Sequence, residues 1–261
     1  MYTILSAYEK ILFNSMLSFL KDHPFAVEAF FESSLVLTYA VPVGYINKLL
    51  PEYLEADTFN NDRAFIAVAL VQAKRLRPMG FPKFMGSDFF LVGYRVFVRY
   101  RNEAGKSLRG LYILGSQTDK YSMAVLGSLF THYRYTIANI SYARKNDVIS
   151  VSDDKGLNIE VKEHGDNDIS LPEGSPFTTW KEARRFAGPL PFTFSYNKQA
   201  KEVVIVEGVR ENWTPAPVEV LQHNVPFVQQ LQLKECVLAS AFIVKNIPYH
   251  WKKGKIEQWR G

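Results

Sequence analysis

The stretch that decides the fold runs Val36-Leu-Thr-Tyr-Ala-Val-Pro-Val-Gly-Tyr-Ile-Asn-Lys-Leu-Leu-Pro-Glu-Tyr-Leu54. Its first residues are apolar, β-branched or aromatic, which is typical of a strand. Pro42 is compatible with the first turn of a helix, so a short helix is expected after it. Pro51 pushes the residue before it out of the helical region and ends that helix. The stretch therefore predicts a strand, a proline-led short helix and a stop.

The clearest strand lies further along the chain, from Phe90 to Arg101. Aromatic and β-branched residues occupy every second position, and Gly93 and the arginines lie on the other face. Residues 102–105 form a turn, and residues 106–115 return as the partner strand of a hairpin. We expect this hairpin at the centre of the sheet.

Many short strand-like segments follow the same alternation, and only a few helical segments interrupt them. The further strand segments are residues 34–41, 63–74, 132–143, 148–152, 156–163, 192–196, 202–209, 218–221 and 236–244, with helices at 121–130 and 178–186. This order is not the βαβ alternation of a parallel sheet, so it favours an α+β chain with a mainly antiparallel sheet. No repeat or low-complexity linker divides the chain, which predicts one compact domain.

The composition excludes several classes of protein. Of the 261 residues, 47% are hydrophobic and 14% aromatic, enough to fill a large core. The net charge is +5 with the two signs interspersed, which does not indicate a nucleic-acid-binding stripe. Cys236 is the single cysteine, so an intrachain disulfide is impossible and a cytoplasmic location is expected. No uninterrupted apolar run is long enough to span a membrane, and the N-terminus lacks the pattern of a signal peptide.

The two ends of the chain differ from the middle. Residues 1–22 place apolar side chains at helical spacing, which predicts an amphipathic helix. That helix packs on the domain or, alternatively, binds a membrane surface or a partner. Residues 249–261 are basic and contain tryptophan, and we expect them to form a tail beyond the domain, which itself spans residues 23–248.

The chain contains no motif for metal binding, covalent catalysis or phosphate binding. The five histidines are scattered, and Cys236 lies in an apolar strand-like run, which is typical of an inert core residue. No metal and no cofactor are therefore expected. What stands out is a cluster of tyrosines and arginines in or beside predicted strands: Tyr94, Arg95, Arg109, Tyr112, Tyr133, Arg134 and Tyr135. Such groups inside a barrel can bind a small carboxylic acid, or the arginines face solvent and the tyrosines only pack.

Four short segments resemble the YqjF-like family of unknown function (domain of unknown function 2071), which belongs to the acetoacetate decarboxylase-like superfamily. They are Leu35-Val-Leu-Thr-Tyr39, Leu49-Leu-Pro-Glu52, Arg109-Gly-Leu-Tyr112 and Thr131-His-Tyr-Arg-Tyr135. The resemblance covers residues 23–248. It implies a closed antiparallel β-barrel with peripheral helices and an internal ligand cavity.

The resemblance also indicates which chemistry is missing. Decarboxylases of this superfamily form a Schiff base through a lysine in the motif Gly-x-Pro-Lys-Lys-x-Ala, and a buried lysine of lowered pKa suits that role. Here His132 stands for the proline, Tyr133 for the reactive lysine and Arg134 for the second lysine. Ala40 and Leu91 stand where the family places an arginine and a catalytic glutamate. Acetoacetate decarboxylase activity is therefore not expected.

Three hypotheses for the function follow. The first is a small-molecule-binding protein whose ligand is a small carboxylate or keto acid, with Arg109, Tyr112, Tyr133, Arg134 and Tyr94 as the binding residues. Because adjacent residues of a strand point to opposite faces, we expect Tyr133 to face the cavity and Arg134 to lie at its rim or behind it. The second is an enzyme of altered, non-imine chemistry that uses Tyr133 and Arg134. The third is an interaction protein that uses the N-terminal helix and the basic tail. A small anionic organic molecule is the expected partner, nucleic acid is not, and a homo-oligomer is compatible with the sequence.

Overall fold

The computed structural model describes residues 19–164, 169–188, 190–198 and 200–259. The stretch from Val36 to Leu54 folds as predicted: β1 (Val27–Pro42) runs directly into the helix α2 (Val43–Asn47). Pro42 precedes the first helical residue with a φ of -58°, a value that its ring imposes. The next long strand, β3 (Arg63–Pro78), then pairs antiparallel with β1 along most of its length.

Seven strands form a closed ring, in the order β11–β10–β5–β4–β3–β1–β13, and β13 pairs with β11 to complete it. Besides β1 and β3 these are β4 (Ser87–Arg101), β5 (Ser107–Thr118), β10 (Phe192–Asn197), β11 (Glu202–Arg210) and β13 (Val237–Trp251). The predicted hairpin of β4 and β5 lies near the middle of this order. The expected closed, mainly antiparallel α+β architecture is confirmed. One pair in the ring, β5 with β10, is parallel, because a long crossover separates the two strands.

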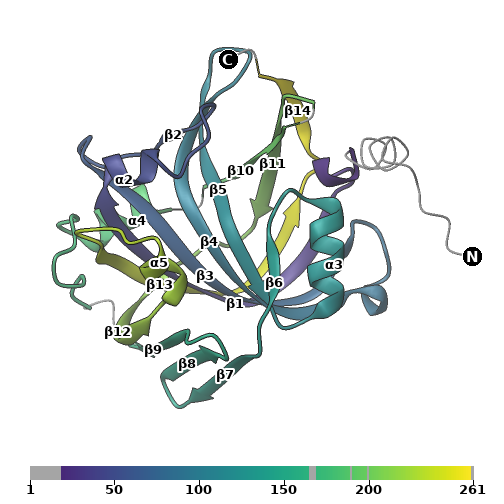
Figure 1. Ribbon diagram of the computed structural model, residues 1–261. Helices are drawn as coiled ribbons and strands as arrows, with labels where there is room; N and C mark the ends of the chain where they lie inside the picture. The colour runs from purple at the N-terminus through teal and green to yellow at the C-terminus, as the bar shows by residue number, and fades with distance from the viewer. Residues whose placement is uncertain (1–18, 165–168, 189, 199, 260–261) are drawn as a thin grey trace, which may run out of the picture.

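The remaining elements surround the ring (Figure 1). In the crossover, β6 (Tyr135–Ile137) lies beside β5, and β7 (Ile140–Lys145), β8 (Val148–Asp153) and β9 (Asn158–Glu163) form an arm that β12 (Ala216–Asn224) joins to β13. The short strand β2 (Glu55–Ala56) pairs with β4. The helices are α3 (Tyr121–Phe130), α4 (Trp180–Phe186) and α5 (Pro226–Gln230), with single turns η1 (Phe19–Asp22) and η2 (Lys83–Met85). In Figure 1, α3 stands beside β6 and η1 at one side of the ring.

The central strand β4 is buried on both faces. Val92, Tyr94 and Val96 belong to the largest apolar cluster, which includes residues of β8, β9 and α5. Leu91, Arg95 and their neighbours of the same parity face the inside of the ring. Because alternation alone does not tell the inner face from the outer one, this assignment comes only from the closed structure.

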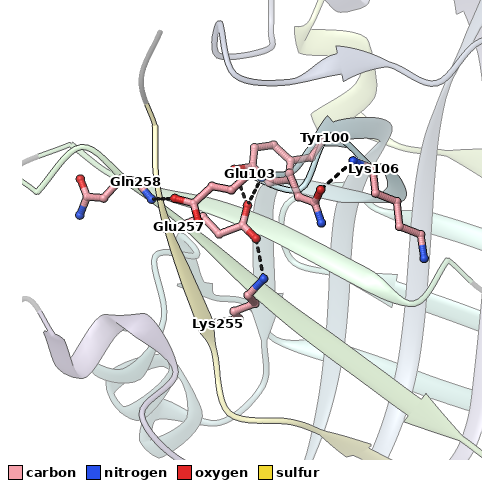
Figure 2. A network of polar contacts seen from close by, with 7 residues as sticks. Tyr100, Glu103, Lys106, Lys255, Glu257 and Gln258 are labelled. Carbon is pink, nitrogen blue, oxygen red and sulfur yellow. Dashed lines mark hydrogen bonds and ion pairs between the residues drawn. The ribbon is translucent and has the colours of Figure 1, made fainter.

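The C-terminal residues form strands, which corrects the expectation of a tail at 249–261. Residues 249–251 complete β13, and β14 (Lys255–Gln258) pairs with β11. Glu257 is only 2% exposed, and its carboxylate accepts hydrogen bonds from Tyr100 Oη (3.0 Å), the Glu103 backbone N–H (3.1 Å) and Lys255 Nζ (2.6 Å) (Figure 2). Three donors satisfy the buried carboxylate, so this charged segment packs onto the domain.

The N-terminal prediction falls largely outside the described residues. Residues 1–18 of the predicted helix are among those not described, and residues 19–22 form the single turn η1. His23 follows with a positive φ of 55°, which turns the chain towards β1. Within the described part of the chain, no helix is both long and apolar enough to cross a membrane.

Candidate functional site

A cavity of about 150 Å³ lies inside the ring, and all seven ring strands contribute to its wall. Two arginines, three tyrosines, a histidine, two serines and two threonines line it together with apolar side chains. These polar residues are Arg95, Arg210, Tyr133, Tyr135, Tyr249, His23, Ser34, Ser116, Thr131 and Thr193. Among the described residues that line this cavity there is no lysine, aspartate, glutamate or cysteine.

Arg95 enters the cavity from the middle of β4. Gly93 precedes it on the same face, and a Cβ at that glycine would lie 3.0 Å from Arg95 Nε. The absence of a side chain at position 93 therefore gives the guanidinium its room. Arg95 Nε is buried and has no hydrogen-bond partner within the described part of the chain. Burying a hydrogen-bond donor of a cation without an acceptor costs free energy, and a ligand oxygen that accepts from Arg95 Nε would offset that cost.

Arg210 enters the cavity from the end of β11. Its guanidinium carbon lies 4.7 Å from the centre of the Trp213 ring and 5.7 Å from that of Tyr249. Aromatic faces stabilise a guanidinium without neutralising its charge. A smaller space of about 60 Å³ beside the cavity is lined by both Arg95 and Arg210. The two cations therefore share one region of the interior.

Neither arginine has a carboxylate partner among the described residues, and the charge of Arg95 acts on Arg210. Burial lowers the pKa of Arg95, and the nearby hydroxyls of Tyr249, Tyr133 and Tyr135 act in the opposite direction. Burial also lowers the pKa of Arg210, and the positive charge of Arg95 lowers it further. Two like charges gathered in a buried space without a counter-charge form an anion-binding arrangement.

The tyrosines supply hydrogen-bond donors to the same space. Burial raises the pKa of Tyr133, although a hydrogen bond with the Thr193 side chain acts against it. Burial raises the pKa of Tyr135 to about 12 and also raises that of Tyr249. The three phenols therefore stay protonated at neutral pH and can donate to an anion.

Local geometry explains why Tyr133 and Tyr135 both point inward. They alternate with Arg134, which is exposed, as the period of two in an extended chain requires. The backbone N–H of Ser116 donates to the Arg134 carbonyl at 2.8 Å and fixes this segment beside β5. Tyr135 packs against Gly127 of α3, where a Cβ would lie 2.5 Å from the ring. A glycine in a helix thus makes room for a cavity residue.

The structure brings only one of the five sequence-predicted site residues into this cavity, which is Tyr133. Arg109 shares the inner face of β5 but lies further along it, where its Nε donates to Asp57 Oδ2 at 2.6 Å and its Nη2 to the Phe186 carbonyl at 3.0 Å. Asp57 is fully buried and also pairs with Arg99 at 2.6 Å. Arg109 thus has a carboxylate partner of its own, away from the cavity.

The other three predicted residues also lie outside the cavity. Tyr94 stacks on Phe227 at 3.9 Å between ring centres, and its hydroxyl donates to Gln117 at 2.6 Å. Tyr112 packs against the large apolar cluster on the same outer face of the ring. The side chain of Arg134 is exposed. The expectation that Arg109, Tyr112 and Tyr133 line one cavity is therefore corrected: Arg109 lies further along the inner face beside Asp57, and Tyr112 points to the other face of β5.

The comparisons with known proteins agree with the fold. The sequence profile of DUF2071, described as an uncharacterized conserved protein, matches residues 29–246. No curated protein sequence matches the chain. Acetoacetate decarboxylase from Legionella pneumophila subsp. pneumophila str. Philadelphia 1 is structurally similar, with 12% identity, a TM-score of 0.58, and coverage of 90% of this chain and 88% of that one.

Two further solved structures show the same likeness. An acetoacetate decarboxylase-like enzyme from Sphingomonas wittichii RW1 has 11% identity and a TM-score of 0.55, covering 92% of this chain and 94% of that one. The enduracididine biosynthesis enzyme MppR, complexed with pyruvate, has 10% identity and a TM-score of 0.53, covering 89% and 90%. At these identities the likeness shows that the fold is shared.

Proposed function

The chain belongs to the DUF2071 family of uncharacterized proteins, and from this starting point we propose that it binds a small organic anion, a carboxylate or keto acid, inside the ring. The observation that carries the proposal is the pair Arg95 and Arg210, which line one cavity without a carboxylate partner among the described residues. A buried charge without a partner costs several kcal/mol. A bound carboxylate offsets that cost, and its planar geometry matches the guanidinium fork.

The chemistry of the wall supports an oxyanion as the ligand. The protonated hydroxyls of Tyr133, Tyr135 and Tyr249 add donors on other sides of the space. The volume of about 150 Å³ corresponds to about five water molecules at ~30 Å³ each. A carboxylate group with a few further atoms fits this space. The structurally similar MppR is complexed with pyruvate, which is a ligand of this size and charge.

Binding here does not proceed through an imine in our proposal. An imine needs a free amine, and no lysine lines the described cavity. Tyr133, the residue that aligns with the reactive lysine in the resemblance described above, lies in the wall and offers a phenol. The ligand is therefore held by charge and hydrogen bonds alone. Because the cavity wall offers no amine among the described residues, we do not propose acetoacetate decarboxylase activity.

Ligand-induced stabilisation tests the proposal. We expect pyruvate, acetoacetate or butyrate to raise the melting temperature of the wild-type protein in chloride-free buffer, since a ligand that binds only the native state stabilises it. Arg95→Met should abolish the shift, whereas Arg134→Met, which removes an exposed cation outside the cavity, should leave it unchanged. Equal shifts in all three proteins would mean that acids bind elsewhere, and the proposal would fail.

His23 favours a second candidate, an enzyme of altered, non-imine chemistry. It lines the cavity, and its buried Nδ1 has no partner within the described residues. Burial lowers the pKa of His23, so the ring is neutral near pH 7 and can accept a proton from a bound keto acid. Arg95 then polarises the carbonyl of the bound keto acid, in place of Arg134, whose side chain is exposed. Proton exchange at C3 of pyruvate, followed by NMR in D₂O, should be accelerated by the wild type and not by His23→Gln.

A further inference from the structure

A second and larger cavity adjoins the anion site. Its volume is about 330 Å³, and it lies between the segment that joins η1 to β1, the start of β1, the end of β3 and α3. Most of its wall is apolar: Pro24, Phe25, Val27, Leu76, Pro78, Leu126, Gly127 and Phe130. We call it the apolar cavity.

The polar residues of the apolar cavity are few and mostly satisfied. Arg77 pairs with Glu28 at 2.9 Å and donates to the carbonyls of Arg75 and Phe81. Thr131 Oγ1 donates to the Gly127 carbonyl at 2.6 Å. Because these groups already have partners, the cavity offers burial of apolar surface and little else.

The apolar cavity and the anion site share three wall residues, His23, Val27 and Thr131. One layer of side chains therefore separates a space that attracts a carboxylate from a space that attracts a hydrocarbon. On the other side of the arginines, Trp213 lines a further cavity of about 260 Å³. That cavity carries Lys181 and Arg184 in its wall, so it suits an apolar chain less well.

We propose that the ligand is an amphipathic monocarboxylate, an acid with an alkyl or aryl chain. This inference rests on the proposed function, because it assigns the carboxylate to Arg95 and Arg210. The chain passes between His23, Val27 and Thr131 into the apolar cavity. The anion site alone holds only a short acid, and the larger apolar volume next to it accounts for the rest of the molecule.

The affinity should depend on chain length in a defined way. Acids as short as butyrate fill only the anion site. Each methylene group buried beyond that length should lower the Kd about fourfold, the equivalent of burying one CH₂. The gain should stop when the apolar cavity is full.

Calorimetric titration of acetate, butyrate, hexanoate, octanoate and decanoate into the full chain, each below its micelle concentration, tests this inference. We expect the Kd to fall from butyrate to octanoate by a factor of about 100 or more. Leu126→Trp replaces a leucine side chain in the wall of the apolar cavity with the larger indole ring. It should remove most of the increase in affinity with chain length while leaving acetate binding unchanged. Val125→Trp is the matched control, since Val125 is equally exposed on α3 but does not line the cavity.

The outcomes separate this inference from the proposed function. If short acids bind in a manner that depends on Arg95 but octanoate binds no more tightly than butyrate, the amphipathic ligand is wrong and the anion site stands. If octanoate gains affinity equally in the wild type and in Leu126→Trp, its chain lies elsewhere, and the inference also fails. If no acid binds in a manner that depends on Arg95, the proposed function itself is overturned.

Discussion

Replacing Arg95 with methionine should make the ligand-free protein more stable. Arg95 is half-buried, its Nε is buried without a hydrogen-bond partner, and no carboxylate among the described residues compensates its charge. Methionine fills a similar volume without the charge. Exchanging buried ionic groups for apolar ones of similar size stabilises proteins by about 1–4 kcal/mol in favourable cases. For a domain of this size, each 1 kcal/mol raises the melting temperature by about 2–4 °C.

Arg109→Met provides the contrast, because it changes the same residue type on the neighbouring strand with the opposite expected sign. Arg109 neutralises Asp57, which is fully buried. Arg99 remains as a second partner of that carboxylate, and Arg109 is itself partly exposed. We therefore expect Arg109→Met to lower the unfolding free energy by only about 1–3 kcal/mol.

Urea unfolding at low ionic strength, in buffer without chloride or carboxylates, measures both changes. Added butyrate should then stabilise the wild type and Arg109→Met but not Arg95→Met. The unfolding free energies of the wild type and Arg109→Met should therefore approach that of Arg95→Met as butyrate is added. A loss of more than about 1 kcal/mol for Arg95→Met without ligand would show that Arg95 is a structural residue, and the reasoning from its uncompensated charge would be refuted.

Three further predictions test other parts of the account. Tyr133→Phe should weaken carboxylate binding about 10- to 100-fold by removing one hydrogen bond to a charged group; Tyr112→Phe, outside the cavity, should not, and equal losses in calorimetry would remove Tyr133 from the site. Borohydride added with pyruvate should leave the protein mass unchanged, and an adduct on any lysine would restore imine chemistry. Burial raises the pKa of Glu257, but its hydrogen bonds with Lys255, Glu103 and Tyr100 outweigh this and lower it below the ordinary value of 4.5. Its contribution to stability is therefore present above that value and lost as the pH falls through the lowered pKa. Glu257→Gln should flatten the acid limb of a plot of unfolding free energy against pH, and an unchanged limb would show that other groups control it.

The sequence was a good guide to the elements because they depend on local signals. Pro42 and Pro51 delimit the short helix, and alternation identifies the hairpin of β4 and β5. The assignment of Tyr133 to a cavity followed from the resemblance, and the structure places Leu91 in the same wall. The overall closure depends on pairing between β11 and β13, which are distant in the chain, and no local pattern encodes it.

The composition of the site was predicted less well, for reasons of geometry. Tyr94 and Arg95 are adjacent, so the choice between them depends on which face of β4 is inside, and alternation does not decide that. Gly93 was the available signal, because a small residue two positions away on the same face leaves room for a long side chain. Arg210 and Tyr249 come from β11 and β13 and join the cavity only through ring closure. Arg109 was misplaced because its partner, Asp57, lies 52 residues away.

A crystal structure of the protein with bound pyruvate tests the central claim most directly. We predict that the carboxylate of pyruvate lies in the ring cavity, with its oxygens about 3 Å from the guanidinium nitrogens of Arg95 and Arg210 and within hydrogen-bond distance of at least one of the phenols. Pyruvate bound covalently to a lysine, or held at Arg109, Arg134 or another surface while the cavity contains only water, would contradict the account.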